Sequence, residues 1–304
     1  MTTRSEAMPG GASLPDPTAP LSPTGNLRRR VAISRLVDAA AMGAALIAVA
    51  LLVGVAFTVL KRGISAISVD FLTSNQAEGG IANALLGTIE IVAIGALLAM
   101  PTGILTGIYL TEFAGPRSRS ARALKLVLDL LQGLPTIIVG VVVFGLLVVP
   151  MQRETGFAGA VAYAIVMLPM IARASQEVLL LVPGSLREAA DALGVDRWRS
   201  VLTVILPAAM GGIVTGAILA IARAAGETAP LLICNSIYNP TTVGLDPFQG
   251  VPSIPMYIFT TYDLPTETAL TRAWGAALVL LTIILIANVG ARVVLARSRA
   301  KMGI

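Results

Sequence analysis

Six long apolar stretches limit the fold of this sequence more than any other feature. Each is long enough to cross a bilayer, which takes about 20 apolar residues in helical form. Backbone polar groups in lipid must bond within their own segment, so such stretches form helices. With 56% hydrophobic and 13% charged residues among 304, the chain also has more apolar surface than one soluble core could bury. We predict an all-α membrane protein with six transmembrane helices. The stretches lie at 37–60, 83–110, 124–150, 158–182, 207–232 and 269–295.

Basic residues predict the orientation of these spans. An inside N-terminus places sixteen Lys or Arg residues in cytoplasmic segments and three in outer segments. Cytoplasmic loops carry this excess of positive charge in membrane proteins. We therefore expect a multi-pass protein of the cytoplasmic or inner cell membrane, in contact with lipid, with both termini in the cytoplasm. Three further arginines lie within or at the edge of spans: Arg173, Arg223 and Arg272.

The spans also predict the domain organisation. Residues 1–30 hold five prolines and few large apolar side chains, which is typical of a disordered tail, here a cytoplasmic one. The next apolar run is too long for a signal-peptide core, so 31–80 is predicted to be an uncleaved first transmembrane helix with its outer loop. Residues 81–295 form the predicted core of the membrane domain, and 296–304 a cytoplasmic C-terminal tail. Segment 233–266, rich in Pro, Gly and aromatic residues, is expected to fold as an outer cap.

Missing residue types exclude several functions. With one cysteine and no histidine, neither an intrachain disulfide nor a usual zinc site can be assembled, and we predict no metal. No G-x-x-x-x-G-K-[ST] loop is present, so no nucleotide cofactor is expected in this chain. No nucleophile and base pattern points to an enzyme. The basic residues lie at the ends of apolar runs, which argues against nucleic-acid binding.

Prolines and glycines fall inside the predicted spans. Pro101, Pro135 and Pro169 each remove a helical hydrogen bond and are expected to kink or interrupt their helices. Glycines within 133–140 and 211–216 allow helices to approach closely or to unwind.

The loop between spans four and five has a recognisable pattern. Glu188-Ala189-Ala190 is followed after three residues by Gly194, and after nine more by Val204, Ile205, Leu206 and Pro207. This resembles the E-A-A, G, I-x-L-P loop of permeases in bacterial ABC importers, with Val204 at the Ile position. The resemblance implies a type I ABC importer permease fold, in which a short cytoplasmic coupling helix docks onto an ATPase subunit. The residues so implied are Glu188, Ala189, Ala190, Gly194, Leu206 and Pro207.

Local chemistry agrees with a helix in this loop. Ser185 can cap it with Glu188 at the third position, and Gly194 can end it. Ala189 and Ala190 are small enough for a partner backbone to come close. The alternative is an interfacial helix without a protein partner, because its arginines and Trp198 would also suit a lipid headgroup layer. The fixed spacing favours docking.

Other segments resemble a narrower family. The run 216–232, with Thr228-Ala229-Pro230-Leu231, resembles the fifth span of phosphate-specific ABC permeases, and the PstA type more than its PstC-type partner. The segments 131–136 and 168–173 agree with this resemblance, which covers roughly residues 81–290. It implies a phosphate importer with four kinds of component: this chain, a homologous PstC-type permease subunit, two ATP-binding subunits that carry Mg-ATP, and an extracytoplasmic phosphate-binding protein.

Charged residues inside spans are candidates for the substrate path, because a buried ionisable group is costly unless it is paired or faces water. Arg223 and Glu227 are four residues apart, as are Arg173 and Glu177, so each pair is predicted to share one helical face. Arg223 lies about 24 Å along its helix from Pro207, and its forked guanidinium suits an oxyanion. We predict a path of Arg223, Glu227 and Arg173. Alternatively, each pair only neutralises itself.

Two other functions remain open on the sequence. The loop pattern does not depend on the substrate, so an importer of another oxyanion or small solute would also fit. An ion-driven secondary transporter could carry protons on Glu90 or Glu227. Secondary transporters usually contain repeated sets of spans, and none is evident here.

Overall fold

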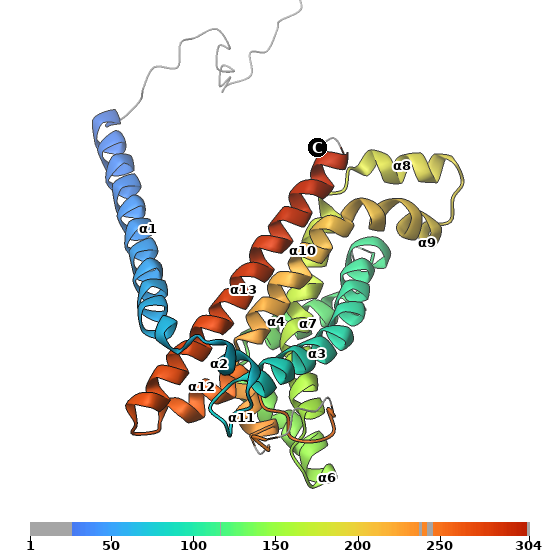
Figure 1. Ribbon diagram of the computed structural model, residues 1–304. Coiled ribbons are helices and arrows are strands. Elements are labelled where there is room, and N and C mark those ends of the chain that lie inside the picture. The colour runs from blue at the N-terminus through green and yellow to red at the C-terminus, as the bar shows by residue number, and fades with distance from the viewer. Residues whose placement is uncertain (1–25, 116, 237–238, 242–245, 303–304) are drawn as a thin grey trace, which may run out of the picture. The chain divides into compact units, whose positions relative to one another are not determined.

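A computed structural model describes residues 26–302 except 116, 237–238 and 242–245 (Figure 1). The part of the predicted disordered tail at 1–25 therefore lies outside the described residues. Within them the chain is helical, with no strand, which confirms the predicted all-α class. The α-helices are α1 Leu27–Gly63, α2 Val69–Thr73, α3 Ala82–Ile108, α4 Arg119–Gly133, α5 Thr136–Val143, α6 Val149–Met151, α7 Gly156–Leu180, α8 Gly184–Ala192, α9 Arg197–Ser200, α10 Leu206–Ala225, α11 Ala229–Cys234, α12 Ile254–Tyr262 and α13 Glu267–Met302.

Four short turns of other helical types extend these helices. A 3₁₀ turn follows α1, and π-helical turns, which hold one extra residue, follow α3, follow α5 and precede α10. Each π-helical turn continues the helix beside it, so α3 and α10 belong to longer spans. These turns are Ile64–Ala66, Tyr109–Phe113, Phe144–Val148 and Val201–Ile205.

The chain divides into two compact units, residues 1–56 and 57–304, and the boundary falls inside α1. In the first unit α1 already begins at Leu27, a few residues before the predicted end of the tail. It belongs to a continuous apolar helix with a mean hydropathy of 2.6, which suits a membrane span.

Five helical segments in the described chain are long and apolar enough to cross a membrane. They are Arg29–Ala66, Ala82–Phe113, Gly156–Leu180, Arg197–Ala225 and Glu267–Val293. A sixth span results if Arg119–Gly133 and Thr136–Met151, which meet at a bend of 105°, count as one. Pro135 lies at this bend and cannot donate a backbone hydrogen bond. The predicted interruption at Pro135 is confirmed, whereas α3 and α7 continue through Pro101 and Pro169.

The centre of the larger unit is the contact between α3 and α7 (Figure 1). Glycines of α3 lie directly against α7: a Cβ at Gly95 would meet the carbonyl oxygen of Ala160 at 2.9 Å, and one at Gly107 would meet the Ser175 side chain at 2.7 Å. Small residues spaced along one face let two helix backbones approach in this way. The side chains of Ile91, Tyr163 and other buried residues fill the adjoining core.

Helix α10 packs against both α7 and α13. A Cβ at Gly212 would meet Val178 at 2.6 Å, and one at Gly216 would meet Ala174 at 2.4 Å. The close approach predicted for glycines 211–216 is therefore confirmed. Gly140 of α5 serves the same purpose, because its Cβ position lies 3.0 Å from Pro230 in α11.

Span five differs from the predicted range 207–232. Helix α10 ends at Ala225, and α11 is a separate short helix from Ala229. Pro230 explains the break, because in a continuing helix its ring would clash with the carbonyl four residues earlier and could not donate to it. Within the larger unit, α8, α9 and the C-terminal end of α13 lie at one end, whereas α6, α11 and α12 lie at the other (Figure 1). Helix α13 continues past 296, where a tail was predicted.

Candidate functional site

The loop between α7 and α10 has the helix and turn that its pattern predicts. Helix α8 is followed by a turn in which the N–H of Leu193 donates to Ala189 and that of Val195 donates to Ala190. Gly194 has a φ of +67°, a left-handed conformation that a side chain disfavours. No atom lies within 4 Å of its Cβ position. The left-handed backbone conformation therefore explains the glycine at this position, and a lack of space for a side chain does not.

The residues of this loop fall into an exposed and an inward set. Glu188 and Ala189 are exposed, and Leu193 at the tip is 81% exposed. Ala190 is only 6% exposed and faces this chain, so it is not free to receive a partner backbone as predicted. Leu206 packs against an apolar cluster of Ile108, Leu179, Val182, Val201, Ile205, Ala209 and Ile213.

The start of the loop helix differs from the prediction. Helix α8 begins at Gly184 with Pro183 in the N-cap position, so the predicted capping box from Ser185 to Glu188 does not form. Proline at this position suits the extended backbone before a helix, and the helix starts two residues earlier than the Ser185 cap would place it. Pro207 lies in the first turn of α10, directly after the π-helical turn Val201–Ile205, and has no N–H to donate within the continuing span.

Arg187 of α8 makes the most extensive side-chain contacts in this region. Its Nη2 donates to the Oε1 atom of Glu112 at 2.7 Å, and its Nε lies 3.2 Å from Oε2. The same guanidinium donates to the carbonyl oxygens of Val182 and Leu179, each at 2.8 Å. The Glu112 side chain is 3% exposed. Hydrogen bonding to Glu112 raises the pKa of the Arg187 guanidinium above its ordinary value.

Arg223 and Glu227 do not form the predicted pair. Helix α10 ends between them, with Gly226 at its C-cap, so the two side chains no longer share a helical face. Instead the Thr136 hydroxyl donates to the Oε1 atom of Glu227 at 2.7 Å, and the Tyr163 hydroxyl donates to the Glu227 backbone carbonyl. The described ion pairs are Arg173–Asp129, Arg187–Glu112 and Arg199–Asp196, and Arg223 belongs to none of them.

Arg223 nevertheless lies near Glu227 through a shared neighbour. Arg223 and Thr136 line the same small cavity, of about 40 Å³, beside the bend between α4 and α5. Gln132 and Pro169 line it too. The Arg223 side chain is exposed in the single chain, so it is free to meet water or an anion on this face. A guanidinium group without other partners binds an anion through paired hydrogen bonds.

Arg173 also has a different partner from the one predicted. Its guanidinium contacts the carboxylate of Asp129 on α4, and not Glu177 one turn along α7. Both side chains are partly open to solvent, at 31% and 60% exposure. Contact between α4 and α7 brings Asp129 to Arg173, and Glu177 stays exposed.

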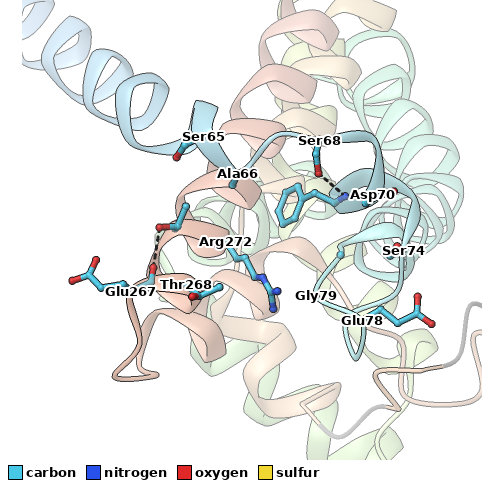
Figure 2. Close-up of a pocket in the computed structure, with 13 residues that line it drawn as sticks. Ser65, Ala66, Ser68, Asp70, Ser74, Glu78, Gly79, Glu267, Thr268 and Arg272 are labelled. Carbon is cyan, nitrogen blue, oxygen red and sulfur yellow. Dashed lines mark hydrogen bonds between the residues drawn. The ribbon is translucent and has the colours of Figure 1, made fainter.

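A second, larger cavity lies around Arg272 at the start of α13 (Figure 2). Its volume is about 450 Å³, and its walls come from segment 65–80 and the first turns of α13. The Arg272 guanidinium lies against Gly79, where a Cβ would meet it at 2.4 Å. An arginine at the end of a span can anchor that span at the membrane surface, and Arg272 lies in such a position.

Sequence reasoning missed three residues of these sites: Glu112, Thr136 and Tyr163. Only Glu112 left a signal, as an acidic residue next to the end of an apolar span, where it needs a counter-charge. Thr136 and Tyr163 bond to a residue 91 and 64 positions away, which no local spacing indicates.

Comparison with known proteins identifies the class of this chain. Residues 99–300 match the family described as binding-protein-dependent transport system inner membrane component. The chain belongs to this family, whose members are membrane-embedded permease components of transport systems.

The comparison also finds individual relatives within this class, and these are phosphate transport permeases. The chain is 37% identical over 240 residues to the phosphate transport system permease protein PstA 1 of Mycobacterium tuberculosis (strain CDC 1551 / Oshkosh), covering 78% of each chain. It is 36% identical over 253 residues to PstA of Yersinia pestis, covering 82% of this chain and 85% of the relative.

Solved structures share the fold. An inward-facing structure of the MetNI methionine ABC transporter aligns with a TM-score of 0.59 at 18% identity, covering 72% of this chain and 95% of the other. A structure of an amino acid ABC transporter with histidines aligns with a TM-score of 0.53 at 15% identity, covering 77% and 100%. The predicted importer permease fold is confirmed.

Proposed function

We propose that this chain is the membrane-spanning permease subunit of an ATP-driven phosphate importer. The observation that carries the proposal is the likeness to phosphate permeases of the PstA type, which extends over about four fifths of the chain. Two features support the proposal: a loop of the importer type at one end, and an exposed arginine beside a broken span, which could meet a passing anion.

A second permease chain is needed in this proposal to enclose the route. Arg223 is exposed on the surface of the single chain, so a solute bound to it would border lipid unless another subunit covered this face. A homologous PstC-type permease is the partner we propose. Two ATP-binding subunits with Mg-ATP and an extracytoplasmic phosphate-binding protein complete the machine. This chain would hold no cofactor of its own.

The exposed side of α8 is the proposed docking surface for one ATPase subunit. Glu188 and Ala189 face outward, and the left-handed turn at Gly194 presents Leu193 at its tip. Ala190 and Leu206 support the docking surface from within, and Pro207 lies exposed in the first turn of α10. The end of α13 lies at the same end of the unit as α8 (Figure 1), which is consistent with a cytoplasmic C-terminus. We place the N-terminus in the cytoplasm too, on the charge distribution alone.

The proposed anion path contains Arg223, Glu227 and Arg173. Arg223 supplies a forked donor for a phosphate oxyanion. Glu227, held by Thr136 at 2.7 Å, provides a carboxylate acceptor that can bond to the hydroxyl of monohydrogen phosphate. Arg173 lies on α7 and forms an ion pair with Asp129. A passing anion would meet weak, successive partners and so would not be trapped.

The test is uptake of labelled phosphate by the purified complex in lipid vesicles. We expect uptake that needs ATP and the binding protein and that excess sulfate does not suppress. Uptake driven by a proton gradient without ATP would contradict the proposal, as would ATP-dependent uptake of a different solute with none of phosphate.

A further inference from the structure

The side chain of Arg187 joins three separate elements at the loop end of the bundle. It extends from α8, bonds to Glu112 in the π-helical turn that ends the α3 span, and bonds to Leu179 in the last turn of α7. A third acceptor residue is Val182, between α7 and α8. Bonds from one side chain to three residues make this contact more than the ordinary ion pair of a protein surface.

The buried acceptor in this contact needs the guanidinium. The carboxylate of Glu112 is almost fully buried, and a buried charge without a partner is strongly destabilising. The Leu179 carbonyl already accepts from the Val182 N–H at 3.3 Å, and Arg187 adds a second bond there and one to the carbonyl of Val182, just beyond the helix end. A planar fork with five donors can bond to all of them at once, and an ammonium group cannot.

The covalent connection of the chain does not by itself hold α8 against α3. Helix α8 follows α7 directly, whereas Glu112 is 75 residues before Arg187 in the sequence. The apolar cluster below the loop includes Ile108 of α3, but such contacts slide more easily than bonds of fixed direction. The Arg187–Glu112 pair is therefore the directional bond between the loop helix and the α3 span.

We propose that Arg187 and Glu112 are positioning residues that transmit the movement of α8 to α3 during the ATP-driven cycle. This inference rests on the proposed docking of an ATPase subunit on α8. When that subunit moves α8, the pair carries α3 with it, and α3 in turn carries α7 through their close glycine contact. Without the pair, α8 would still dock, but its displacement would reach the route only in part.

The experiment compares Arg187→Lys and Glu112→Gln with the wild type, in the complete complex reconstituted with its binding protein. Lysine keeps the charge without the fork, and glutamine keeps the shape without the charge. Arg119→Gln is the matched control, because Arg119 is exposed in the first turn of α4. Phosphate uptake and ATP hydrolysis are measured in the same vesicles. We expect both variants to retain the ATPase subunits, while phosphate transported per ATP falls at least fivefold and the control stays within twofold.

A second readout does not depend on the solute. In a Cys234→Ser background, Leu105→Cys places one thiol on the exposed side of α3 near this contact. ATP with vanadate should change its rate of labelling in the otherwise wild-type complex, and Arg187→Lys should abolish that change. An unaltered change in labelling, an unaltered transport ratio or loss of assembly in both variants would overturn the inference. A wild-type complex that shows the change in labelling but takes up no phosphate would contradict only the proposed function.

Discussion

Two arginines of the helical bundle, Arg187 at the loop end and Arg223 at the broken span, have opposite surroundings. At the loop end, Arg187 is bonded to a buried carboxylate and two carbonyls, so its binding capacity is used within the chain. At the broken span, Arg223 is exposed and belongs to none of the described ion pairs. An arginine whose donors are occupied fixes the position of helices, whereas one whose donors are open can receive a ligand. The comparison assigns mechanical coupling to the first and anion binding to the second.

The largest effect is expected at Arg223. Arg223→Gln removes the charge and the fork, and we expect phosphate uptake to fall about 100-fold, because charged hydrogen bonds to an anion contribute about 3 kcal/mol. Arg223→Lys should restore little, since it keeps charge without paired donors. Uptake by reconstituted vesicles is the measurement, and retention of the ATPase subunits on purification is the control. Near-normal uptake by an assembled Arg223→Gln complex would mean that Arg223 has only a structural role.

A smaller effect is expected at the turn of the loop. Gly194→Val forces a branched side chain into the left-handed conformation, which costs about 1–2 kcal/mol and should weaken ATPase-subunit binding about tenfold. Gly194→Asn is the matched control, because asparagine tolerates this conformation and the space around the Cβ position is open. Pull-down of the ATPase subunit at graded concentrations measures the difference. Equal losses in both variants would show that the turn geometry is not what docking requires.

The smallest effect concerns the neighbour shared by Arg223 and Glu227. Thr136→Val keeps the shape and removes the hydroxyl that holds the Glu227 carboxylate, and we expect uptake to fall roughly fivefold for the loss of about 1 kcal/mol. Thr136→Ser should stay close to wild type because it retains the donor. A Thr136→Ser variant as impaired as Thr136→Val would point to packing of the methyl group instead of the hydrogen bond.

The sequence predicted features that depend on local chemistry. The interruption at Pro135 and the turn at Gly194 follow from the missing proline N–H and from the freedom of glycine, and both are present. Close helix approach at Gly212 and Gly216 was predictable for the same reason, because it requires only the absence of a side chain. These properties belong to single residues, so no knowledge of distant segments was needed.

Side-chain pairing was predicted wrongly because it is decided by distant segments. Spacing of four residues suggested that Arg223 pairs with Glu227. Because of Pro230, helix α10 ends before Glu227, and the Thr136 hydroxyl donates a hydrogen bond to the Glu227 carboxylate instead. Arg173 likewise pairs with Asp129, 44 residues away, because α4 packs beside α7. The break at Pro230 was readable from the sequence. The identity of the new partners was not, since it depends on how the helices pack.

Thiol labelling at position 223 tests the comparison most directly. The chain has one cysteine, Cys234, which is buried, so the wild-type complex should not react with a charged, membrane-impermeant thiol reagent. In Cys234→Ser, the added substitution Arg223→Cys should create a site that an anionic reagent labels in the assembled complex. Absence of labelling in a complex that assembles and hydrolyses ATP would contradict the account, because Arg223 would then lie outside any aqueous route.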